Sequence, residues 1–146
     1  MESGVAYTKI DPDGDDRFQR LRQELGISSF GLNLLRFGPG QGSRIHRHLR
    51  QEEAYVVLEG TLTLVVEGEA RELGRGELAR VAPDVRRQLL NRHRERLLLL
   101  AVGGANEHEG RDGRAYHSWE ESGEGHPPAD VPLAADVPLA DERREP

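Results

Sequence analysis

The sequence predicts an all-β barrel or sandwich. From Ser28 onward its apolar runs are short and are separated by glycine, proline and asparagine, as in antiparallel strands joined by tight turns. No glycine-rich phosphate loop stands between a strand and a helix, so a nucleotide-binding α/β fold is not expected. The length of 146 residues suits one domain that can bury a core without cross-links.

The elements follow in chain order. The N-terminal residues predict a short strand over Val5–Ile10, a turn at Asp11–Gly14, and a helix over 16–25 that is stopped by Gly26. Eight strands are then expected, over 28–37, 42–48, 54–58, 61–67, 70–73, 77–81, 85–91 and 96–102.

Composition changes after Trp119 and indicates three regions. Residues 1–27 are expected to form a lead-in, 28–119 the barrel, and 120–146 a disordered tail rich in proline, alanine and acidic residues. The tail contains a tandem hexapeptide, Ala129–Ala134 followed by an identical Ala135–Ala140, which is too short for a solenoid.

Charge and composition narrow the possible partners. The net charge of −6 argues against nucleic acid, whose phosphates need a concentrated positive field. Without cysteine, a metal site must use histidine, carboxylate or water. The longest apolar run, Leu97–Val102, is too short to span a membrane, and the first residues do not resemble a signal peptide. We therefore expect a cytoplasmic protein without a membrane partner.

The stretch from Gly40 to Gly60 carries the strongest chemical signal. His46 and His48 are two residues apart, so on a strand both imidazoles point to the same face. Glu53 begins the next strand, where a hairpin could bring its carboxylate beside them. Two histidines and one carboxylate on one face suit Fe(II) and related metals.

These residues resemble the first motif of the cupin superfamily. Its pattern is Gly, five residues, His-x-His, three or four residues, Glu, six residues and Gly, and this chain satisfies it at each fixed position. The resemblance covers about residues 28–105. It implies a double-stranded β-helix (jelly-roll) barrel in which His46, His48 and Glu53 are three of four metal ligands, and it suggests a homodimer.

The second cupin motif is only partly present. Counting from Gly76, the position of the usual fourth ligand, a histidine, holds Arg87, and the final asparagine is Asn91. Arginine cannot ligate a metal, because it stays protonated and has no free lone pair. Three arrangements therefore remain open: a three-ligand metal site with Arg87 turned aside or binding an anionic substrate, a metal-free site with Arg87 paired to Glu53, or a slipped strand with Gln88 facing inward.

The resemblance implies a small cupin that binds a divalent metal (Fe, Mn, Zn or Ni) and a small, anionic organic ligand, as in a metal-dependent dioxygenase or isomerase. Tyr55, Arg87, Gln88 and Asn91 are the candidate substrate-binding residues, and the sequence singles out no catalytic residue. Two alternatives are a non-catalytic sensor that has lost its metal and a scaffold that has kept only the barrel.

Overall fold

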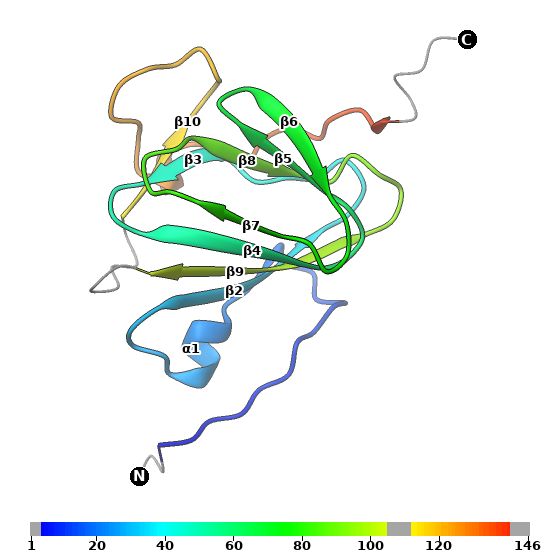
Figure 1. Ribbon diagram of the computed structural model, residues 1–146, viewed down its shortest axis with the longest axis vertical. Coiled ribbons are helices and arrows are strands. Elements are labelled where there is room, and N and C mark those ends of the chain that lie inside the picture. The colour runs from blue at the N-terminus through cyan, green and yellow to red at the C-terminus, as the bar shows by residue number, and fades with distance from the viewer. Residues whose placement is uncertain (1–3, 105–111, 141–146) are drawn as a thin grey trace.

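The computed structural model describes residues 4–104 and 112–140, and it forms two five-stranded antiparallel sheets (Figure 1). The first sheet has the order β1 (Phe18–Gln19), β2 (Gly31–Phe37), β9 (Leu97–Gly104), β4 (Glu52–Glu59), β7 (Leu78–Val81). The second has the order β10 (Gly113–Tyr116), β3 (Ile45–His48), β8 (Arg87–Leu90), β5 (Leu62–Val66), β6 (Glu69–Leu73).

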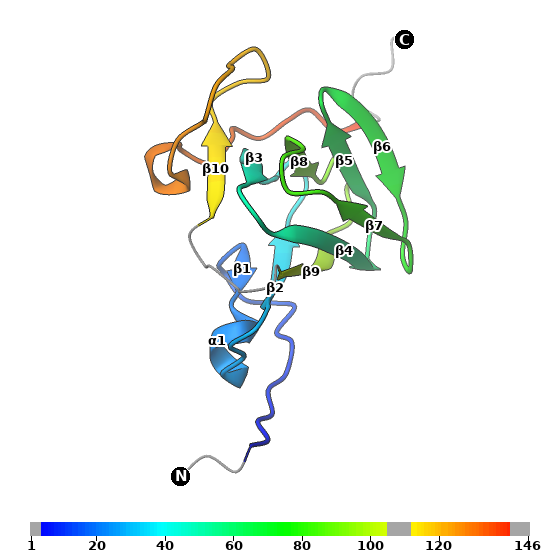
Figure 2. The same ribbon diagram turned by 60° about the vertical axis from the view of Figure 1, so that its left-hand side comes forward.

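The two sheets face each other across one hydrophobic core (Figure 2). Leu35 and Val57 of the first sheet pack in the same cluster as Leu64 and Leu89 of the second. The predicted double-stranded β-helix is confirmed, and so are the eight strands expected between residues 28 and 102. No helix in the described residues is long and apolar enough to cross a membrane.

The backbone at Gly60 explains why the first cupin motif ends with a glycine. Its φ of 83° lies in the left-handed region, which other residues adopt at a cost. A Cβ at this position would also lie 2.3 Å from the carbonyl oxygen of Arg96. Glycine is therefore needed for the turn that follows β4, the strand that carries Glu53.

The N-terminal predictions need correction. No strand forms over Val5–Ile10, and the helix α1 spans only Leu21–Leu25, because Phe18 and Gln19 instead extend the first sheet by pairing with β2. Gly26 ends the helix with a φ of 72°, as the sequence indicated. Leu21 packs on the outer face of the sheet against β2 and β9.

Of the tail predicted to be disordered, the structure describes residues 120–140, whereas 141–146 lie outside the described residues. The segment lies against the barrel: Arg44 Nε donates to the Val131 carbonyl at 2.7 Å, and the Val137 amide donates to Gly40 at 2.9 Å. A 3-10 helix, η1, spans Pro128–Asp130. Val131 and Leu139 are buried, so the tail contributes apolar contacts that its polar composition did not reveal.

The tandem hexapeptide offers a matched test of this packing. Leu139 is 8% exposed, whereas Leu133, its equivalent in the first copy, is 42% exposed. We expect Leu139→Ala to lower the free energy of unfolding by about 2 kcal/mol, and Leu133→Ala by less than about 0.5 kcal/mol. Urea denaturation measures both variants. Equal small effects would show that the segment does not pack on the barrel in solution.

Candidate metal centre

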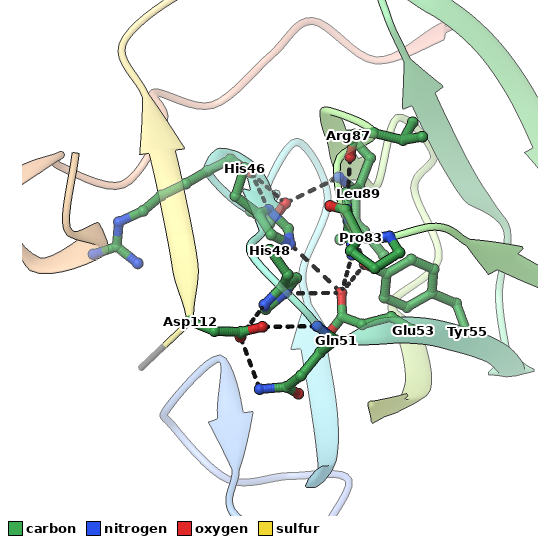
Figure 3. Close-up of polar contacts among 12 residues, drawn as sticks. His46, His48, Gln51, Glu53, Tyr55, Pro83, Arg87, Leu89 and Asp112 are labelled. Atoms are coloured by element: carbon green, nitrogen blue, oxygen red, sulfur yellow. Dashed lines mark hydrogen bonds and ion pairs between the residues drawn. The ribbon is translucent and has the colours of Figure 1, made fainter. Parts of the chain in front are cut away.

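Strands β3 and β4 bring the predicted ligands together at one end of the core. His46 and His48 point inward from the second sheet, and Glu53 faces them from the first (Figure 3). Glu53 Oε1 lies 3.7 Å from His46 Nε2 and 3.2 Å from His48 Nε2. The chain crosses between the sheets in residues 49–51, so neighbours in sequence approach the same point from opposite sides.

The Nδ1 atoms of both imidazoles have hydrogen-bond partners. His46 Nδ1 lies 2.9 Å from the Arg44 carbonyl oxygen, and His48 Nδ1 lies 2.8 Å from Asp112 Oδ1. Since both partners accept, Nδ1 carries the proton, and in the neutral ring the Nε2 lone pair faces Glu53. Metal-binding histidines are typically oriented in this way by a carbonyl or a carboxylate.

The spacing of the three donor groups also fits a metal ion. Two atoms each about 2.1 Å from an ion, at tetrahedral or octahedral angles, lie roughly 3.0–3.4 Å apart. The two Nε2–Oε1 distances are within a few tenths of an ångström of that range. His46, His48 and Glu53 therefore form a cluster able to hold a divalent metal.

Asp112 also belongs to this centre, through its contact with His48, although no motif in the sequence indicates it. Its carboxylate is 1% exposed; besides contacting His48 it accepts hydrogen bonds from the backbone amides of Arg50 (2.9 Å) and Gln51 (2.7 Å). Burial opposes its charge, but the contacts from His48 and the two amides outweigh burial and lower the pKa of Asp112. Asp112 lies 64 residues after His48 in the sequence. It immediately precedes β10, a strand that the sequence did not predict.

Arg87 occupies the usual fourth-ligand position, directly opposite His46 in the pairing of β3 with β8. Its side chain is fully buried, and NH2 donates to Glu53 Oε1 at 2.8 Å. Nε donates to the Tyr55 hydroxyl at 3.1 Å, and that hydroxyl in turn donates to Glu53 Oε1. Of the positions of Arg87 that the sequence left open, the structure therefore has the one in which Arg87 faces inward and is paired with Glu53.

The remaining guanidinium nitrogen binds the turn between β7 and β8. NH1 donates to the carbonyl oxygens of Ala82, Pro83 and Val85 at 3.4, 3.2 and 2.7 Å. All three nitrogens of Arg87 thus have protein acceptors. In this conformation the guanidinium hydrogen-bonds to Glu53, to Tyr55 and to the turn.

The electrostatics of the cluster favour a charged Glu53. Burial works against the charge, but the contacts with His46 and His48 outweigh it and hold the pKa of Glu53 well below its usual range. Burial likewise disfavours a charged His48, but the Glu53 and Asp112 carboxylates raise the pKa of His48. A metal must displace that proton, so metal affinity is expected to fall as the pH drops.

Comparison with known proteins identifies the barrel. Residues 33–103 match the cupin domain family model. This barrel is a cupin domain. No curated protein sequence matches the chain.

Three solved structures resemble this cupin. A sugar phosphate isomerase of the cupin superfamily from Silicibacter pomeroyi is 30% identical, with a TM-score of 0.61 over 69% of this chain and 65% of that one. A protein from Acidithiobacillus ferrooxidans, provisionally named a sugar phosphate isomerase, is 27% identical, with a TM-score of 0.55 over 60% and 57%. A cupin 2 conserved barrel domain protein from Salinispora arenicola is 26% identical, with a TM-score of 0.55 over 66% and 81%. The match thus spans less than two thirds of the first two proteins.

A cavity with two lobes opens beside the cluster, and both lobes reach His48 and Glu53. One lobe, of about 200 Å³, is mostly apolar and is lined in part by Phe18, Leu35 and Tyr55. The other, of about 240 Å³, is polar and is lined by residues that include Arg20, Arg22, Gln23 and Gln51. The cupin thus offers a potential ligand an apolar wall and a cationic wall on two sides of the cluster.

Two of the predicted substrate-binding residues, Gln88 and Asn91, hydrogen-bond to the backbone. Gln88 Nε2 donates to the Ser43 carbonyl at 3.0 Å, which excludes the slipped strand with Gln88 facing Glu53. Asn91 Nδ2 donates to the carbonyl oxygens of Phe37 and Glu95 at 3.0 and 2.8 Å. Among the four candidates, Tyr55 lines the apolar lobe. Direct contact of any of the four with a substrate stays a prediction.

Proposed function

We propose that this cupin binds a divalent metal through His46, His48 and Glu53 and isomerises a small phosphorylated sugar. The metal-binding proposal rests on the orientation of the two imidazoles. Their Nδ1 atoms already contact acceptors, and both Nε2 atoms face Glu53. The bound metal would supply a Lewis acid for a carbonyl or hydroxyl oxygen. The similarity to the Silicibacter pomeroyi enzyme supports the substrate class.

The polar lobe supports an anionic substrate. Arg20 and Arg22 line it beside His48 and Glu53, and guanidinium groups bind phosphate well because their planar donors match its oxygens. The apolar lobe, with Tyr55 and Phe18, would exclude water from the other side of the sugar. In this arrangement the chain orients the substrate by its phosphate, and Asp112 and Arg44 hold the imidazoles in place.

Metal content of the purified, untagged protein tests the first part of the proposal. We expect about one Fe, Mn, Zn or Ni ion per chain at this site, and loss of that ion in His46→Ala. His93→Ala is the control, because His93 contacts Glu72 rather than the cluster. An unchanged metal content in His46→Ala would refute the assignment.

Substrate specificity tests the second part. We expect Arg22→Gln to raise KM for a phosphorylated aldose or ketose about 10–100-fold, since a charge-assisted hydrogen bond contributes about 1.5–3 kcal/mol. The kcat should change little, and Arg75→Gln, in the exposed turn before β7, should leave KM unchanged. Isomerase assays over a panel of sugar phosphates measure this. Equal turnover of unphosphorylated sugars would contradict the phosphate site.

One observation favours a second candidate, a metal-free binding protein. Arg87 places a fully buried cation 2.8 Å from Glu53 Oε1, the oxygen that also faces both imidazoles. That cation would repel a metal ion. If the purified protein carries no metal and takes up none, the barrel would be a binding module whose cavity holds a small anion.

A further inference from the structure

A second group of histidine and carboxylate side chains lies in the segment after β10. His117 Nδ1 is 3.2 Å from Glu121 Oε1, and His126 Nε2 contacts Glu121 Oε2. The two rings are 4.8 Å apart and inclined at 67°. The candidate donor atoms of the three residues all lie within 4.8 Å of one another. Three potential ligands thus converge within ten residues of chain.

The backbone holds this loop in place independently of the three side chains. Ala115 of β10 and His126 exchange two hydrogen bonds, of 2.8 and 2.9 Å, which close the loop at its base. Arg86 NH1 donates to the carbonyl oxygen of Glu121 at 2.5 Å, which anchors the middle of the loop to the barrel. The ligand geometry is therefore largely built before any ion binds, so little ordering is needed on binding.

We propose that His117, Glu121 and His126 form a second metal site, which takes up Zn²⁺ or a similar divalent ion. Two imidazoles and one carboxylate are a common set of zinc ligands, with water completing the coordination. The side chains of His117 and His126 are 53% and 40% exposed, so an ion and its water can reach them. The ion would bridge the two ends of the loop and fix it against β10.

This site is separate from the cluster between the sheets. His126 is paired with Ala115, and Ala115 is paired with His46, so two strand spacings, about 10 Å, separate the backbones of the two histidines. The two groups share no residue. The inference therefore stands whether or not the first cluster holds a metal.

Trp119 lies between His117 and Glu121 in the sequence and is the only tryptophan of the chain, so its fluorescence reports on this loop. The experiment titrates Zn²⁺ into metal-stripped full-length protein in the His46→Ala background, which removes the first site. We expect a saturable change in fluorescence at about one ion per chain. The change should be lost when His117→Ala or His126→Ala is added.

His93→Ala, added to the same background, is the matched control, because His93 also contacts a glutamate, Glu72, but belongs to no group of three potential ligands among the described residues. It should leave the titration unchanged. The absence of a saturable change in the His46→Ala protein would overturn the proposal. So would an identical titration after loss of His117 or His126, and circular dichroism confirms that these variants remain folded.

Discussion

Replacing Arg87 by methionine is expected to lower the free energy of unfolding by about 3–5 kcal/mol. The guanidinium is fully buried and donates to Glu53, Tyr55 and three backbone carbonyl oxygens. Removing one member of a buried ion pair is strongly destabilising, because it leaves the other charge buried without its partner. Urea denaturation of the metal-free protein measures the loss.

The neighbouring glutamate supplies a matched control. Arg80 Nε lies 2.7 Å from Glu52 Oε2, but these side chains are 68% and 57% exposed, so solvent screens their attraction. Arg80→Met should therefore cost less than about 1 kcal/mol. In Arg87→Met/Glu53→Gln, part of the lost stability should return, because the uncompensated charge is gone. If Arg87→Met were as mild as Arg80→Met, the buried pair would not form in solution.

The barrel and the cluster of His46, His48 and Glu53 could be predicted because the sequence patterns that indicate them are local. Short apolar runs separated by tight turns mark the strands, and glycines such as Gly60 stand where the backbone requires them. The spacing of His46, His48 and Glu53 brings three donor groups to one point, as predicted. Counting from Gly76 to Asn91 also placed Arg87 at the usual fourth-ligand position, and in the structure that residue is paired with His46.

The features that the sequence did not predict depend on contacts distant in the chain. Asp112 reaches His48 from a segment that has no motif. The two hexapeptides are identical, yet Leu139 is buried and Leu133 is exposed, so the barrel surface rather than the local pattern decides which of the two leucines is buried. The direction of the Arg87 guanidinium likewise depends on Tyr55 and the turn at 82–85, and three alternatives had therefore stayed open.

Arg87→His is expected to raise the affinity for a divalent metal by about 100-fold or more. The substitution removes a cation that hydrogen-bonds Glu53 and places an imidazole on β8 directly opposite His46. Directly paired residues have Cβ atoms about 4.5–5.5 Å apart, so the new ring can join the same cluster. It restores the histidine that the cupin pattern has at this position, and a fourth donor replaces a repulsive charge.

Competition with a chelator of known affinity measures this change in the wild type, in Arg87→His and in Arg87→Met. A large gain in the histidine variant and a smaller gain in the methionine variant would separate the added ligand from the removed charge. Equal gains would mean that repulsion alone weakens the natural site. If neither variant gained affinity, Arg87 would not weaken metal binding. His46, His48 and Glu53 would then bind the ion equally well with the Arg87–Glu53 pair in place.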